Sequence, residues 1–314
     1  MRTKRISSCT METLCSAGLM LAAAIWGFAF VVVKDSLAYV GAVWMIAIRF
    51  SIAAILLMLL YCRRLKDLNA SYWKHGFILG TMIFLAYAFQ TVGCDYTSAG
   101  KNAFLTAVYV ILVPLISWPL CRKRPAWYVF LAALIFFAGI GLVAIKESGD
   151  SLLEINIGDI LTLVCGIFYA LHIIFIARYD ETEDPVLLSA LQFLFTAVWA
   201  WIVSPFISSP AINRPLELAL LCRPSVIFSM LYLGILSTML AFLLQNVCLK
   251  YVPSSLGSLF MSLEAVFGVV FGVLFLHEDI APRCLLGFAL IFAAILIAEV
   301  LPKLGRRESA DKTH

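Results

Sequence analysis

The chain contains ten long apolar segments in succession, and they leave little room for anything else. Each is about 20 residues long, which is the length at which an α-helix crosses the hydrocarbon core of a bilayer. The segments are apolar on every side, whereas the outer helices of a soluble bundle need a polar face. The pattern predicts an all-α membrane protein with ten transmembrane helices, at residues 14–33, 40–61, 75–94, 102–121, 126–145, 157–177, 186–206, 226–249, 254–276 and 282–301.

Composition agrees with a membrane protein and argues against other classes. Hydrophobic residues make up 63% of the 314 residues and charged residues only 13%, against about 25% charged in ordinary soluble domains. The longest loops, at 146–156 and 207–225, are too short to fold alone as a soluble catalytic domain. The net charge of +4 does not indicate a nucleic-acid partner. The expected partners are the lipid bilayer and a small-molecule substrate.

The positions of the positive charges predict the orientation in the membrane. Sixteen lysines and arginines lie at the two termini or in the even-numbered connections, and six lie in the odd-numbered ones. The positive-inside rule therefore puts the tails 1–13 and 302–314 in the cytoplasm. An even number of spans also requires both termini on one side, so the two arguments agree.

The last five segments repeat the first five. Five is an odd number, so the second half enters the membrane in the opposite orientation, and two inverted five-helix repeats are expected at 14–145 and 157–301. Inverted repeats of this kind are typical of secondary transporters with a site near the midplane. The pairs that align under shifts of 155 and 143 residues are Gln90 with Gln245, Tyr96 with Tyr251, Tyr109 with Glu264, Trp26 with Tyr169, Arg49 with Gln192, and Phe50 with Phe193.

Motifs for bound metals, nucleotides and cofactors are missing from the sequence. The nine cysteines are scattered and form no CxxC or Cys/His cluster, so neither a disulfide framework nor a metal site is expected. There is no Walker motif, glycine-rich phosphate loop or HExxH. We therefore expect no cofactor and no ATP drive, and any energy must come from an ion gradient or from the gradient of the substrate itself.

Several short motifs occur together at matching places in the two halves. As a set, they make the chain resemble an EamA-type member of the drug/metabolite transporter superfamily over residues 14–301. One departure is Glu264-Ala265, where that family often has Glu-Pro. The residues that carry the resemblance are Trp26-Gly27, Arg49-Phe50, Ser98 to Thr106, Gln245-Asn246, Lys250-Tyr251, Ser262 to Ala265, His277-Glu278 and Gly287.

The resemblance implies a fold and an activity that the residues alone do not give. It implies a ten-helix basket around a central cavity, with the fifth and tenth helices at the periphery. It also implies movement of small organic solutes, typically outward, by alternating access, in a bacterial cytoplasmic (inner) membrane. The motifs say little about which solute is moved.

Two charged residues lie deep inside predicted spans, where an ionisable group needs a partner or a cavity. Arg49 and Glu264 are both near the middle of their spans. We hypothesise that they face one central cavity. Arg49 would bind a carboxylate or another polar group of the substrate, and Glu264 an ammonium group, a coupling proton or another coupling ion. The alternative is a structural Arg49–Glu264 ion pair, or an arginine that holds neighbouring helices together.

The remaining candidates are polar or aromatic residues within spans. His172 would either relay protons or hydrogen-bond as a neutral ring to a neighbouring helix. Trp26 and Tyr169 match across the repeat, and Tyr109 would lie opposite Glu264. Pro114 frees a backbone carbonyl and is a candidate hinge. The other candidates, each with a structural alternative such as helix capping or packing, are Gln90, Gln245 and Asn102.

Three classes of function compete. The leading one is a secondary transporter that exports small polar or amphipathic metabolites, amino-acid-like or drug-like. A non-transporting membrane scaffold or sensor is the second. A membrane-embedded enzyme is the least favoured, because His277, Glu278 and Asp279 are adjacent on a turn and do not share a face. The GxxxG pattern at Gly268 and Gly272 allows close packing either within the chain or in a homodimer, so the sequence leaves the oligomeric state open.

Overall fold

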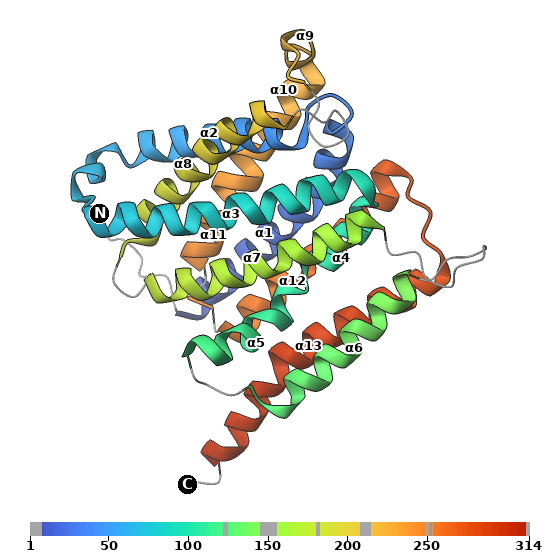
Figure 1. Ribbon diagram of the computed structural model, residues 1–314. Coiled ribbons are helices and arrows are strands. Elements are labelled where there is room, and N and C mark those ends of the chain that lie inside the picture. The colour runs from blue at the N-terminus through green and yellow to red at the C-terminus, as the bar shows by residue number, and fades with distance from the viewer. Residues whose placement is uncertain are drawn as a thin grey trace.

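Helices make up almost all of the structure, a computed structural model that describes residues 8–121, 125–144, 156–179, 183–207, 215–248, 251–252 and 254–311 (Figure 1). Much of the positive charge that predicted the orientation, including Arg122 to Arg124 and the residues before Ser8, lies outside these ranges. The helices are α1 (Ser8–Ser36), α2 (Ala42–Leu60), η1 (Cys62–Asp67), α3 (Ala70–Tyr96), α4 (Ala99–Thr106), α5 (Tyr109–Cys121), α6 (Trp127–Ala144), α7 (Ile157–Tyr179), α8 (Pro185–Val203), η2 (Ser204–Phe206), α9 (Leu218–Leu221), α10 (Pro224–Leu231), η3 (Tyr232–Leu240), α11 (Ala241–Cys248), α12 (Ser254–Leu276) and α13 (Pro282–Asp311).

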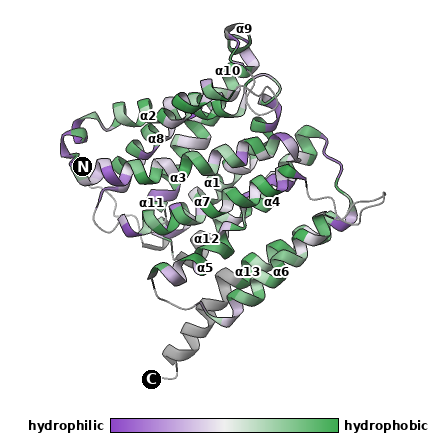
Figure 2. Ribbon diagram, in the orientation of Figure 1, coloured by the Kyte–Doolittle hydropathy of each residue, from purple (hydrophilic) through white to green (hydrophobic). Residues whose placement is uncertain are grey.

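The predicted fold class is confirmed. Among the residues that the structure describes, seven helical stretches are long and apolar enough to cross a membrane, and three shorter apolar stretches, at Trp127–Val143, Phe260–Leu276 and Pro282–Ile297, bring the number to the predicted ten. Hydrophobic residues run along these helices, and hydrophilic residues gather at helix ends and connections (Figure 2).

Two of the ten spans depart from the regular helix that the sequence predicted. The fourth is interrupted by a turn at Ala107 and Val108, so that it consists of α4 and α5. The interruption lies several residues before Pro114, and α5 continues through that proline. The eighth span contains η3, a π-helical segment of 9 residues between α10 and α11. Such segments occur frequently at functional sites.

The helix contacts made by one half have counterparts in the other half. Helix α6 packs on α13 at one side of the molecule (Figure 1), and α2 packs on α8. Helix α1 contacts α11 and α12, just as α7 contacts α3, α4 and α5. The rings of Phe50 and Phe193, which align in the repeat, meet where α2 and α8 pack, with centroids 5.7 Å apart.

The two halves run in opposite directions. Near the end of α1, the Lys34 ammonium donates to the carbonyls of Cys94 (2.7 Å) and Thr97 (2.8 Å) at the end of α3. Just before α7, the Asn156 side chain donates to the carbonyl of Tyr96 in the same region. The end of α1 and the start of its counterpart α7 therefore lie at one face, which we call the Lys101 face. The opposite face, which holds the starts of α3 and α8, is called the Arg64 face.

Small residues allow the helices of the two halves to approach closely. A Cβ atom on Gly27 of α1 would lie 2.4 Å from the Cβ of Phe267 in α12. A Cβ on Gly268 would lie 2.4 Å from the Cβ of Ala103 in α4. The GxxxG face of α12 thus packs within the chain, and these contacts fix the positions of α1, α4 and α12 around the centre.

Candidate functional site

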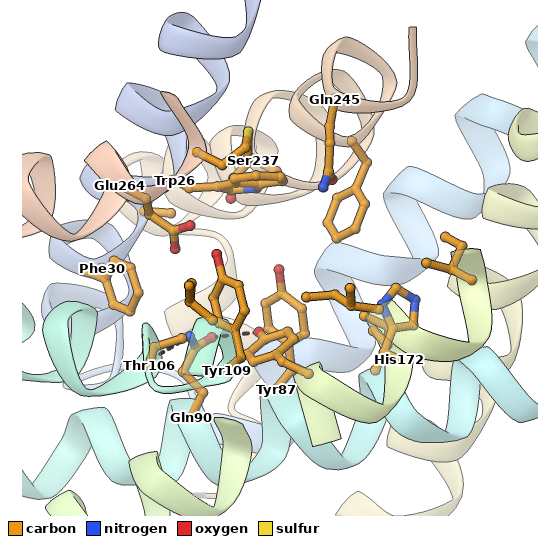
Figure 3. A pocket seen from close by; sticks show the side chains of 18 of the residues that line it. Trp26, Phe30, Tyr87, Gln90, Thr106, Tyr109, His172, Ser237, Gln245 and Glu264 are labelled. Carbon is orange, nitrogen blue, oxygen red and sulfur yellow. Dashed lines mark hydrogen bonds between the residues drawn. The ribbon is translucent and has the colours of Figure 1, made fainter. Parts of the chain in front are cut away.

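A cavity of about 700 Å³ lies between the two halves. This volume lies in the range of small-molecule sites, about 300–1,000 Å³. It is bounded by helices of both repeats, and Figure 3 shows part of its wall. All nine predicted substrate or coupling residues and the hinge candidate line it: Trp26, Arg49, Gln90, Asn102, Tyr109, Pro114, Tyr169, His172, Gln245 and Glu264.

Glu264 contributes a carboxylate to the wall from the middle of α12. In Figure 3 the carboxylate lies beside the indole of Trp26, across the cavity from Tyr87 and Gln90. The side chain is partly exposed to the cavity, and within the described chain it has neither a hydrogen-bond nor an ion-pair partner. An acceptor without a partner in an apolar setting is available to a ligand.

Arg49 is held firmly in the wall by α2 and the π-helical segment. Its Nε donates to Thr238 Oγ1 at 3.1 Å and one terminal nitrogen donates to Ser237 Oγ at 3.0 Å. The guanidinium carbon lies 4.8 Å from the ring centroid of Tyr87, and the residue is only 2% exposed. It is not within ion-pair distance of Glu264, so the predicted alternative of a direct Arg49–Glu264 pair is not present in this structure.

The π-helical segment also fixes Trp26. The Trp26 Nε1 donates to the main-chain carbonyl of Ser237 at 2.7 Å. The Thr238 hydroxyl donates a hydrogen bond to the carbonyl of Leu233, five residues earlier, at 2.8 Å. Both residues therefore bind the π-helical segment: Trp26 contacts its backbone at Ser237, and Arg49 contacts its hydroxyl side chains.

A hydrogen-bonded chain crosses from α3 to α4 and α7 at the other side of the cavity. Gln90 Nε2 donates to Thr106 Oγ1 at 3.1 Å, and the Tyr169 hydroxyl donates to Gln90 Oε1 at 3.0 Å (Figure 3). Asn102 Nδ2 donates to Thr162 Oγ1 at 2.8 Å. These bonds join helices of both halves.

His172 makes the neighbouring-helix contact that was one of its two predicted roles. Its Nε2 lies 2.8 Å from Gln192 Oε1 in α8, and the residue is 5% exposed. Asn246, next to Gln245 at the end of α11, donates to Ser189 Oγ at 2.9 Å. The polar groups on this side of the cavity therefore hold α7, α8 and α11 together.

The cavity reaches toward both the Lys101 face, where Val33 and Cys94 near the ends of α1 and α3 line it, and the Arg64 face. Its lining includes Ala177, two residues before the end of α7, and Asn246, two residues before the end of α11. At the Arg64 face, His75 Nδ1 of α3 lies 2.7 Å from Glu183 Oε1, just before α8, and this contact joins the two helices. That contact lies between α3 and the start of α8 and contributes no lining residue.

A polar layer lies beyond the other end of the cavity, at the Lys101 face. Lys101 Nζ pairs with Asp159 Oδ2 at 2.6 Å, and Asp159 Oδ1 accepts from the Thr97 hydroxyl at 3.0 Å. Glu278 accepts from the backbone N–H groups of Ala99 (2.6 Å) and Gly100 (3.1 Å), and so caps α4. These contacts connect α3, α4, α7 and the loop after α12 just beyond the cavity residues Val33 and Cys94.

Sequence reasoning missed part of the site. Ser237 and Thr238 were not singled out, although two adjacent hydroxyl side chains in the middle of a mostly apolar span are a usable signal. Glu278 was weighed only as part of the family motif His277-Glu278 and as part of a turn that could have formed an enzyme site. Its role as a cap on α4 depends on the packing of two distant segments, which spacing along the chain does not reveal.

Comparison with known proteins specifies the class and the family of this membrane protein. The model of the EamA-like transporter family matches residues 14–145 and 156–299. The chain belongs to this family, which is part of the drug/metabolite transporter superfamily. The family and its relatives are named as transporters rather than as enzymes.

Relatives in other organisms are similar over most of their length. A protein of Archaeoglobus fulgidus described as an "Uncharacterized transporter" is 34% identical over 288 residues, which cover 90% of this chain and 85% of that protein. The "Uncharacterized transporter YoaV" of Bacillus subtilis is 22% identical, with 89% and 94% covered. A solved crystal structure with 17% identity superposes with a TM-score of 0.63 over 92% of this chain and 97% of the other, which supports the fold.

Proposed function

We propose that this protein is a secondary transporter that exports small polar or amphipathic metabolites, amino-acid-like or drug-like, across a bacterial cytoplasmic membrane. The observation that carries the proposal is the cavity of about 700 Å³ between two inverted halves, lined by residues near both faces. Alternating access needs a central site of this kind, between two halves that can rock against each other.

The charge distribution supports the direction. The positive-inside rule assigns the Arg64 face to the cytoplasm, because sixteen of the lysines and arginines lie on that side of the predicted topology. In this orientation the cavity takes up solute from the cytoplasm, while the ion pair of Lys101 with Asp159 closes the outer end. Separation of that pair would release the solute outward.

Glu264 is the residue that we assign to solute or coupling-ion binding. It is the cavity's carboxylate, it is partly exposed there, and it has no partner among the described residues. A group in this position can exchange one cation for another, whether the second is a proton or another coupling ion. The absence of nucleotide-binding motifs agrees with a gradient as the source of energy.

Metabolite profiling of cells and medium tests the proposal without a known substrate. We would compare cells that make the wild-type protein, Glu264→Gln and Glu217→Gln at matched membrane abundance. Glu217 is an exposed loop residue, so its substitution removes one negative charge away from the cavity. We expect one or more solutes to accumulate in the medium with wild type and Glu217→Gln but not with Glu264→Gln. Profiles identical to an empty-vector control, or solute accumulation inside the cells, would contradict export.

A further inference from the structure

We propose that the cavity binds small organic cations, with an amine or ammonium group at Glu264 and an aromatic or alkyl body against the ring-lined wall. This inference deepens the proposed function and rests on it for its biological meaning, although the binding itself can be tested separately.

The first observation is the unpartnered carboxylate. Glu264 lines both the main cavity and a small side pocket next to Tyr109. The buried carboxylates of Asp159 and Glu183, by contrast, have partners, Lys101 and His75. A carboxylate that lacks a partner in an apolar cavity is stabilised by a ligand that brings a positive charge and N–H donors.

The second observation is the aromatic wall around that carboxylate. Trp26 and Phe242 pack edge to face with centroids 5.3 Å apart, and Tyr109 packs on Tyr169 at 6.2 Å. All four rings line the cavity, and Figure 3 shows Trp26 beside Glu264. The faces of aromatic rings attract cations, most strongly when the cation is removed from water. The same rings provide an apolar surface for the body of an amphipathic ligand.

The third observation concerns Arg49, because its contacts indicate whether the ligand is a cation or a zwitterion. The guanidinium donates to two hydroxyl groups, lies against the rings of Tyr87 and Phe50, and is 2% exposed. These contacts stabilise its charge within the wall, since hydroxyl oxygens and ring faces both favour a cation. The ligand therefore needs an amine for Glu264 and does not need a carboxylate for Arg49.

Equilibrium binding to the purified full chain in lipid nanodiscs tests this charge preference. The probes are four indoles with one aromatic body and different charges: tryptamine as the cation, tryptophan as the zwitterion, indole-3-propionate as the anion and tryptophol as the neutral alcohol. Labelled tryptamine gives a direct dissociation constant, and the other three are measured as competitors. We expect tryptamine to bind about tenfold or more tightly than any of the other three, because a charge-assisted hydrogen bond contributes this much.

Variants assign the preference to one residue. Glu264→Gln is expected to weaken tryptamine binding about tenfold and to leave tryptophol binding nearly unchanged. Glu217→Gln, the matched control, should bind all four probes as wild type does. Glu264→Asp keeps the charge and should keep the order of the four probes.

Several results would overturn the inference. Failure of wild type to bind tryptamine would do so, and so would tighter binding of tryptophan or indole-3-propionate, which would assign carboxylate recognition to Arg49. Equal tryptamine binding by wild type and Glu264→Gln would also overturn it. The four-probe order on wild type decides the question even if Glu264→Gln does not fold. Solute export without tryptamine binding would refute this inference alone, whereas tryptamine binding without any export would refute the proposed function.

Discussion

The ion pair between Lys101 and Asp159 gives a quantitative prediction about opening at the Lys101 face. Its atoms are 2.6 Å apart, and the two side chains are 20% and 5% exposed. An exposed pair contributes about 0–1 kcal/mol, whereas breaking a buried pair costs about 3–5 kcal/mol. Because this pair is partly buried, we expect that breaking it costs about 2 kcal/mol, between those limits. If opening of the face separates the two residues, Asp159→Asn raises the population of the open state about 30-fold.

The native Cys94 reports this opening. It lines the cavity behind the polar layer and is 1% exposed in this structure. A membrane-impermeant thiol reagent, added outside intact cells, would measure its reactivity in a background with Cys222→Ser and Cys284→Ser, because Cys222 is exposed and Cys284 partly exposed. We expect Asp159→Asn to increase the rate of Cys94 modification about 30-fold over wild type. The signal should vanish when Cys94→Ser is added.

A matched variant separates opening from a general charge effect. Asp35 is an exposed carboxylate just after Lys34, so Asp35→Asn removes the same charge at the same face without breaking the ion pair. We expect Asp35→Asn to leave the Cys94 rate within about twofold of wild type. An unchanged rate in Asp159→Asn, with Cys94 still reactive after denaturation, would refute the assignment of this pair to a closed outer end.

Two further predictions concern the packing and the π-helical segment, and both are measured as thermal unfolding of purified protein. Gly27→Val should destabilise the protein by about 2–3 kcal/mol, because a Cβ there lies 2.4 Å from that of Phe267. As a control, Gly141→Ala adds a Cβ with no atom within 4 Å, so its free energy of unfolding should stay within about 0.5 kcal/mol of wild type. Arg49→Lys should cost about 2 kcal/mol, because lysine lacks the planar fork that reaches two hydroxyls and stacks on rings; equal stability of Arg49→Lys and wild type would contradict the account of this residue.

The sequence was sufficient for the fold because the bilayer imposes one length on every helix. Ten apolar segments of that length predicted ten spans. The contact of Phe50 with Phe193, which align in the repeat, became visible only in the structure. The irregular places were not predictable in the same way. The turn at Ala107 and Val108 carries no proline or glycine, and Pro114, the visible breaker, remains inside α5.

Candidate cavity residues were found where their chemistry is costly in a membrane. Arg49 and Glu264 were conspicuous because a charge deep in a span needs an explanation, and both do line the cavity. Ser237 and Thr238 were missed because a hydroxyl can bond to its own helix and costs little there. Their role follows from the π-helical turn, which forms where Trp26 and Arg49 of other helices provide the partners.

The measurement that tests the central claim most directly is counterflow in proteoliposomes. The vesicles would contain the purified full chain and a high internal concentration of the unlabelled solute that metabolite profiling identifies, with a trace of labelled solute added outside. A carrier whose single cavity opens alternately to the two faces exchanges one solute for the other, so the account predicts a transient accumulation of label above equilibrium. This overshoot should be absent with Glu264→Gln and present with Glu217→Gln. Simple equilibration of the label without an overshoot would contradict alternating access, and no uptake at all would contradict transport of that solute.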